Sequence, residues 1–130
     1  MSEWRWLTIE VILAIHDEQL AEHGGRPGIC DIALLESALA RPKNRAAYGP
    51  ATAFELAAAY AFGIIRDHSF VDGNKRVAFL AAALFLVEHG WEVAATDEAI
   101  VTIMLALAAG TVDEAGFASW LRQSTAEGAG

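Results

Sequence analysis

Three segments of the chain are apolar on every side of a helix, and they constrain the fold more than any other feature. They span 56–65, 77–87 and 99–109, and Thr102 alone interrupts the last of them. A helix that is apolar all round is normally buried. Alanine and leucine outnumber β-branched residues in these segments, which favours helices over strands. The sequence therefore predicts an all-α fold, a compact bundle of about six helices with these three at its centre.

Two amphipathic segments precede the apolar ones. The first begins after Thr8, whose side chain can cap a helix, and ends at the glycines 24–25. The second is expected over 32–40, from a cap at Asp31 to a stop at Pro42, because proline breaks a helix interior. Both should lie on the surface with one apolar face turned inward.

The remaining segments are shorter and more polar. Segment 42–50 is expected to form a short β-hairpin or an exposed loop. A final helix is expected over 113–122, followed by a frayed tail over 124–130. We expect a single domain over 1–123 with no linker, since a chain of 130 residues can bury an independent core.

Composition excludes several classes of function. A net charge of −8 argues against direct nucleic-acid binding, which depends largely on a basic surface. The longest apolar run, 77–87, is shorter than the ~20 residues of a membrane helix. The single cysteine, Cys30, forms no intramolecular disulfide, and 7–15 does not resemble a secretory signal. These features predict a cytoplasmic protein without a membrane segment.

The chain has to turn between two of the apolar segments. One helix over 52–89 would be about 57 Å long, whereas a compact domain of this size is roughly 36 Å across. The natural break is 71–73, Val-Asp-Gly. His68 therefore lies in a loop between two buried helices, and Asn74 begins the second of them.

Two cations at this helix start point to an anion site. Lys75 and Arg76 lie where unpaired N–H groups already make a positive end, so they cost stability unless an anion is bound. With an anion, the backbone N–H groups, the ammonium and the guanidinium all act on the same ligand. Gly73 lets the backbone approach that ligand closely. Phosphate is the anion that such an arrangement most often binds.

The neighbouring residues add chemistry to this phosphate site. Asp72 offers an oxygen ligand for Mg²⁺, which typically takes one or two carboxylates together with phosphate oxygens and water. His68 can accept a proton near neutral pH. Together, these residues predict transfer of part of a nucleotide to an alcohol.

Other interpretations of the same residues stay open. Taken singly, Asp72 is an ordinary turn or cap residue, and His68 can simply favour a helix C-terminus. A hydrolytic metal site would have to use the four histidines, His16, His23, His68 and His89. Only the first two share a helix face and no HExxH-like spacing occurs, which disfavours that site.

The stretch HSFVDGNKR, 68–76, resembles the signature of the Fic/Doc superfamily, His-x-Phe-x-(Asp/Glu)-Gly-Asn followed by Gly-Arg in most Fic proteins. Lys75 stands where that second glycine would be, and Phe79 stands where Fic enzymes carry another arginine. Both departures resemble the Doc (death on curing) branch. The resemblance also covers GGRPG at 24–28 and LFLVEHG at 84–90.

The resemblance implies a Doc-like toxin that acts as a protein kinase. His68 would deprotonate a serine or threonine hydroxyl, and Asp72 would hold Mg²⁺. Residues Gly73, Asn74, Lys75 and Arg76 would cradle the phosphates of ATP. The implied target is elongation factor Tu, whose modification arrests translation, and the implied partner is a Phd-type antitoxin. Segment 43–48 would correspond to the flap that aligns the target peptide.

Two alternatives accompany this interpretation. A Fic-type adenylyltransferase would transfer AMP to its protein target, and the residues at Lys75 and Phe79 argue against that reaction. A binding module would dock a phosphorylated or acidic partner at the same helix start without catalysis. Such a module would tolerate the loss of His68.

Overall fold

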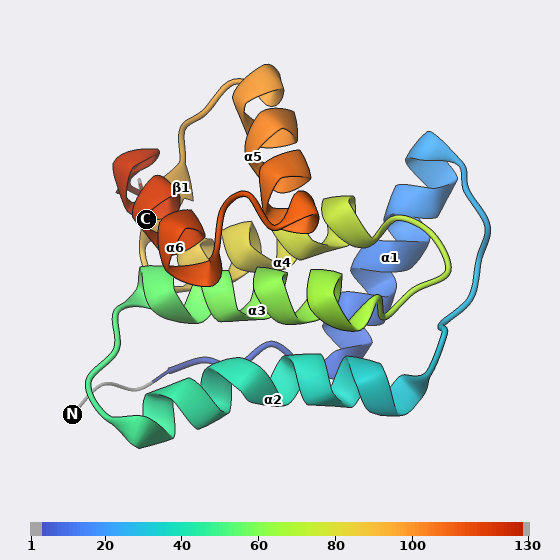
Figure 1. The fold of residues 1–130 in the computed structure, drawn as a ribbon, viewed down its shortest axis with the longest axis horizontal. Helices are drawn as coiled ribbons and strands as arrows, with labels where there is room; N and C mark the ends of the chain where they lie inside the picture. The colour runs from blue at the N-terminus through green and yellow to red at the C-terminus, as the bar shows by residue number, and fades with distance from the viewer. Residues whose placement is uncertain (1–3, 129–130) are drawn as a thin grey trace.

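The computed structural model describes residues 4–128, which form six helices and two short strands (Figure 1). The elements are α1 (Ile9–His23), α2 (Ile32–Tyr48), α3 (Ala53–Asp67), α4 (Asn74–Glu88), β1 (Trp91–Val93), α5 (Asp97–Ala109), α6 (Glu114–Gln123) and β2 (Thr125–Glu127). The expected all-α bundle of about six helices is confirmed. None of the described helices combines the length and apolarity needed to cross a membrane.

Helix α3 is the centre of the bundle. It packs between α2 and α4, and α6 lies against it as well (Figure 1). A capping box starts α3: the Glu55 backbone N–H donates to the Thr52 hydroxyl, and the Thr52 backbone N–H donates to the Glu55 carboxylate. Ten of its fifteen residues are buried, as the all-round apolar pattern predicts.

An aromatic cluster joins the N-terminal segment to α4. Phe85 is fully buried, and its ring lies 4.2–6.1 Å, centroid to centroid, from the rings of Trp4, Trp6, Tyr60 and His89. The buried Tyr60 hydroxyl accepts a hydrogen bond from the Leu7 backbone N–H at 2.9 Å, and burial raises the pKa of Tyr60 to about 12. These contacts hold the chain before α1 against the core.

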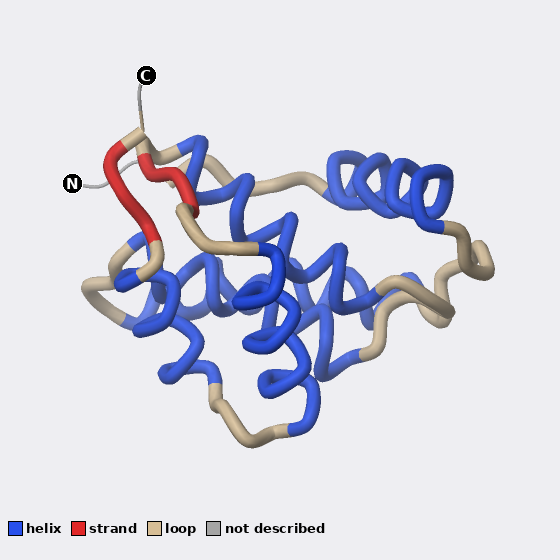
Figure 2. Tube along the Cα trace, turned by 90° about the horizontal axis from the view of Figure 1, so that it is seen from above, coloured by secondary structure: helices blue, strands red, loops and turns tan. Residues whose placement is uncertain are grey.

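The α1–α2 connection lies alongside the α3–α4 loop (Figures 1 and 2). Ile29 and Phe70 form an antiparallel bridge between the two segments. The Cys30 N–H donates to the Ser69 carbonyl at 3.0 Å, and the Val71 N–H donates to the Gly28 carbonyl at 3.1 Å. The loop that contains the signature is therefore held by backbone pairing to a distant segment.

The structure corrects the predicted end of the second helix. Helix α2 continues through Pro42 to Tyr48, so segment 43–48 is helical and forms no hairpin. Proline removes the N–H that would bond to the carbonyl of Ala38. Gly63 of α3 packs directly on that carbonyl: a Cβ at position 63 would lie 3.1 Å from the Ala38 oxygen. Gly63 therefore allows α3 to lie close against α2 at Ala38.

The structure also corrects the predicted burial of the last apolar segment. Helix α5 packs on the bundle by one face only, where Met104 and Leu107 are buried. Val101 and Leu105 are 57% and 53% exposed. An apolar helix is buried all round only if neighbours surround it, and α5 lies at the edge of the bundle (Figure 1).

The predicted frayed tail contains a strand. Within 124–130, β2 pairs antiparallel with β1, and Trp91 lies opposite Glu127. The Gly128 N–H extends this pairing by donating to the Gly90 carbonyl at 2.8 Å. The expectation of fraying is therefore wrong for Thr125–Glu127, because the partner strand lies far away in the sequence; positions 129–130 lie outside the described residues.

Candidate active site

Helix α4 begins without a side-chain cap. Its N-cap is Gly73 in the left-handed conformation, φ +83°, which glycine adopts without strain. The first helical hydrogen bond runs from the Val77 N–H to the Gly73 carbonyl. No acidic residue lies in the first turn. The N–H groups of Asn74, Lys75 and Arg76 are therefore available to an anionic ligand.

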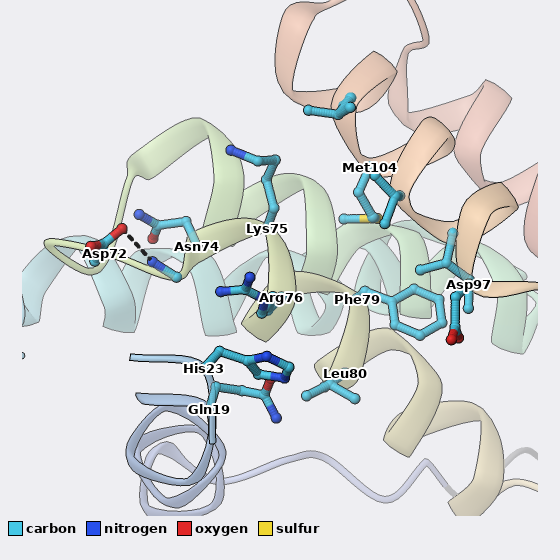
Figure 3. Close-up of a pocket in the computed structure, with 14 residues that line it drawn as sticks. Gln19, His23, Asp72, Asn74, Lys75, Arg76, Phe79, Leu80, Asp97 and Met104 are labelled. Carbon is cyan, nitrogen blue, oxygen red and sulfur yellow. Dashed lines mark hydrogen bonds between the residues drawn. The ribbon is translucent and has the colours of Figure 1, made fainter. Parts of the chain in front are cut away.

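A cavity of about 620 Å³ lies at this helix start (Figure 3). Asp72, Lys75 and Arg76 lie toward one end of it, and apolar side chains that include Phe79 and Met104 lie toward the other. Neither cation has an ion-pair or hydrogen-bond partner among residues 4–128. The residues that line the cavity come from α1, the signature loop, α4 and α5: Gln19, His23, Asp72, Gly73, Asn74, Lys75, Arg76, Phe79, Leu80, Asp97, Ile100, Val101, Met104 and Leu105.

The Asp72 carboxylate is held at the entrance of the cavity by backbone donors. Oδ2 accepts the Arg26 N–H at 3.2 Å, and Oδ1 accepts the Gly73 N–H at 3.2 Å. These hydrogen bonds, that of Arg26 foremost, and the charges of Arg26 and Arg76 lower the pKa of Asp72. The side chain is therefore a carboxylate throughout the neutral range.

A titration can test this lowered pKa. In a carbon NMR titration, the midpoint of the Asp72 carboxyl should lie below that of an ordinary aspartate. A lowered pKa in the folded state stabilises the fold above the unfolded-state pKa, and this contribution is lost as the pH falls through the folded-state pKa. In Arg26→Ala the midpoint should stay low, because the backbone donor remains. A midpoint at or above the ordinary value in the wild type would contradict the assignment.

The side chain of Asn74 has a structural role. Its Oδ1 accepts the Phe70 N–H at 2.9 Å, and its Nδ2 donates to the Phe70 carbonyl at 2.8 Å. This pair of bonds closes the loop from Phe70 to Asn74. The backbone N–H of Asn74 stays available for the predicted phosphate cradle.

His68 lies outside the set of residues that line the cavity. It ends α3 as a C-cap in the left-handed conformation, with φ +47°, and its imidazole is exposed. Nδ1 lies 3.8 Å from the Sγ of Cys30. The structure thus brings Asp72, Lys75 and Arg76 together in one cavity and places His68 at the opposite end of the same loop.

Sequence reasoning did not assign three polar residues of α1 to this site. Gln19 and His23 line the cavity, and His16 lies buried beneath the signature loop. The spacing of 16, 19 and 23 puts them on one helix face. The signal that could have found them is the presence of polar residues on the face of an amphipathic helix that is otherwise apolar.

The four histidines do not form the hydrolytic metal site that the sequence left open. Among residues 4–128, no group of three His, Cys, Asp or Glu side chains is placed to hold a metal ion.

Gly25 brings the first loop against the Asp72 carboxylate. Its φ is +121°, and a Cβ at this position would lie 3.2 Å from Asp72 Oδ2 and 3.1 Å from a methyl of Leu20. We expect Gly25→Ala to displace the carboxylate and to lower the affinity for the predicted ligand, ATP, by about tenfold, as changes around a ligand-holding group commonly do. Isothermal calorimetry with ATP and Mg²⁺ measures this loss.

Gly24→Ala is the matched control for this variant. Gly24 also has a positive φ, +77°, but a Cβ there would meet no atom within 4 Å. Both variants carry backbone strain, whereas only Gly25→Ala adds a clash with Asp72. Equal loss of affinity in the two variants would contradict the proposed contact.

Comparison with known proteins identifies the family. The sequence pattern of the Fic/DOC family matches residues 6–86, which include the signature loop and most of α4. The chain belongs to the Fic/Doc family, in its Doc branch. It is 33% identical to the protein kinase doc of Escherichia phage P1 over 120 residues, which cover 92% of this chain and 94% of that protein. It is 40% identical to the toxin Doc of Mycolicibacterium smegmatis over 75 residues, which cover 55% of this chain and 57% of that toxin.

The residues at the start of α4 fit the nucleotide and the metal that the Fic/Doc family implies. Each oxygen of Asp72 accepts a single N–H and keeps a free lone pair, and the side chain is exposed. Mg²⁺ needs only one or two protein carboxylates when phosphate oxygens and water complete its shell. Lys75 and Arg76 would supply charge for the phosphates. Asp72 would therefore hold the ion that accompanies a bound nucleotide.

Proposed function

We propose that this protein is a Doc-type toxin that transfers the γ-phosphate of ATP to a serine or threonine hydroxyl of a protein. The observation that carries the proposal is the convergence of Asp72, Lys75 and Arg76 in one cavity at the uncapped start of α4. The relatives named protein kinase doc and toxin Doc support the same function.

In the proposed reaction, His68 takes the proton of the target hydroxyl. Nε2 is the nitrogen assigned to this step, since Nδ1 faces Cys30. The hydroxyl oxygen attacks the γ-phosphorus, the bond to the β–γ bridging oxygen breaks, and ADP leaves with that electron pair. Mg²⁺ held by Asp72 would supply charge neutralisation at the phosphates.

The electrostatic contribution to this reaction comes from the start of α4. Negative charge on the phosphoryl oxygens is stabilised by the exposed N–H groups, the Lys75 ammonium and the Arg76 guanidinium. His68 lies at the other end of the loop, so the target hydroxyl has to lie between the imidazole and the cavity. The exposure of His68 leaves it accessible to a target protein.

Two residues favour phosphoryl transfer over transfer of AMP. Lys75 lines the cavity, and its side chain would compete for space with an α,β-diphosphate in the orientation for AMP transfer. Phe79 lines the cavity at the position where most Fic enzymes supply another arginine, so one cationic contact for the distal phosphates is missing. ATP bound in the reverse orientation presents its γ-phosphate to the target hydroxyl instead.

The proposed biological setting follows from the resemblance to the Doc branch. We propose that the target is a translation factor, elongation factor Tu, and that its phosphorylation arrests translation in the cytoplasm. A Phd-type antitoxin would hold the toxin in check by folding a disordered segment onto it. The net charge of −8 is consistent with a protein target rather than direct contact with nucleic acid.

Labelled nucleotides test the proposal. Purified protein is incubated with a translation extract and with ATP labelled at either the γ- or the α-phosphate. We expect one protein band to gain label from γ-labelled ATP only, and mass spectrometry of that band to find one added phosphoryl group. Label from α-labelled ATP would identify the protein as an adenylyltransferase. Nucleotide binding without transfer of either label would support a binding module.

A further inference from the structure

Beneath the signature loop lies a buried histidine from α1 to which the proposed reaction gives no role. His16 is 3% exposed, and its Nε2 lies 2.9 Å from the carbonyl oxygen of Asp72. Its ring stacks on that of Phe70, with centroids 3.9 Å apart and planes 15° apart. One side chain thus contacts both the anchored start of the loop and the residue that carries the proposed metal ligand.

The partner of His16 shows that the imidazole is the donor of this hydrogen bond. A carbonyl oxygen can only accept, so Nε2 carries the proton and donates it to Asp72. The stacking on Phe70 holds the plane of the imidazole, and Asn74 in turn holds Phe70 by two hydrogen bonds to its backbone. The donor is therefore placed by packing as well as by the hydrogen bond itself.

This bond determines which way the Asp72–Gly73 peptide unit faces. The described chain contains no cis peptide bond, and in a trans peptide the carbonyl and the following N–H point in opposite directions. With the Asp72 carbonyl turned inward to His16, the Gly73 N–H points away from the interior. That N–H lies 3.2 Å from Oδ1 of Asp72, and both residues line the cavity.

We propose that His16 is a positioning residue that orients the Gly73 N–H and the Asp72 carboxylate toward the bound nucleotide. The inference rests on the proposed function for its ligand, ATP with Mg²⁺, but its structural content concerns the free protein. Loss of the Nε2 donor allows the peptide unit to rotate, because the Asp72 carbonyl then has no partner among the described residues. A carbonyl that faces the buried imidazole and has lost its donor is unfavourable, which favours the rotated form.

Two variants of His16 separate the contribution of the hydrogen-bond donor from that of the aromatic ring. His16→Gln keeps an amide N–H close to the position of Nε2, whereas His16→Phe keeps an aromatic ring on Phe70 and removes the donor. We expect His16→Phe to bind ATP with Mg²⁺ about tenfold more weakly in calorimetry, and His16→Gln to recover most of that loss. Rescue by glutamine would not occur if His16 only filled space, since glutamine restores the donor but not the ring.

The orientation of the Gly73 N–H gives a readout that needs no nucleotide. Its residual dipolar coupling in the free protein should change in His16→Phe and stay near the wild-type value in His16→Gln. An unchanged coupling in His16→Phe would overturn the inference, whatever the affinities. Failure of the wild type to bind ATP would instead count against the proposed function, and the dipolar coupling would still decide the role of His16.

If His16→Phe does not fold, the tautomer of His16 in the wild type tests the inference instead. Nitrogen NMR of the imidazole should find the proton on Nε2, which supports donation to Asp72. A proton on Nδ1 with Nε2 unprotonated would overturn the inference, because two acceptors cannot form a hydrogen bond.

Discussion

Replacing His68 with asparagine should lower the rate of phosphoryl transfer by about 10²–10⁴-fold, the usual contribution of a general base. Asparagine is not basic at neutral pH, yet it tolerates the left-handed conformation that position 68 adopts, with φ +47°. The backbone of the loop should therefore be preserved. The rate is measured by transfer of label from γ-labelled ATP to the target.

The affinity for ATP is the control measurement for the His68→Asn variant. His68 lies outside the cavity lining, so the affinity for ATP with Mg²⁺ should change by less than about threefold, within ~0.7 kcal/mol. The melting temperature should also stay close to that of the wild type, because the imidazole is exposed. Transfer at the wild-type rate would remove His68 from the role of base. Loss of ATP binding would indicate instead that the imidazole helps to hold the nucleotide.

Replacing Phe85 with alanine should destabilise the protein by about 3–5 kcal/mol, the largest effect that we expect on stability. The ring is fully buried and contacts four other aromatic rings, so its removal leaves a cavity that rigid neighbours fill poorly. For a domain with a typical stability of ~5–15 kcal/mol, this loss should lower the melting temperature by on the order of 10–20 °C. Urea denaturation measures the change.

Val87→Ala is the matched control in the same helix. Val87 lies two residues further along α4 and is 56% exposed, so its truncation should change stability by less than about 0.5 kcal/mol. Similar losses in the two variants would mean that Phe85 is not a central packing residue. The expected difference between them tests whether the aromatic cluster anchors the chain before α1.

The sequence predicted helices well where the signals were local. Thr8 and Asp31 each cap the helix that follows, as predicted, and the chain breaks before Asn74, where the length of a continuous helix required a break. Prediction failed where distant packing decided the outcome. Helix α2 continues through Pro42, which is buried in the bundle, and the exposure of α5 depends on the absence of a neighbour over Val101 among the described residues.

For the candidate site, too, local sequence signals predicted some residues and missed those that distant packing brings in. Lys75 and Arg76 could be proposed from the sequence because two adjacent cations at a helix start are unusual, and a few neighbouring residues are enough to recognise them. The contribution of α1 was not predictable from such local rules. His16 reaches the signature loop, and Gln19 reaches the cavity, only because α1 packs beside α4, a contact between segments about sixty residues apart.

The backbone pairing between 28–30 and 69–71 has a consequence for protein engineering. Besides the internal bonds between Phe70 and Asn74, the signature loop is held by hydrogen bonds to the glycine-rich loop, so its conformation depends on both. Grafting the nine-residue signature onto a foreign scaffold would transfer the reactive side chains without the template that holds them. A transplant that keeps the catalytic geometry has to carry the glycine-rich loop as well, joined in the same register.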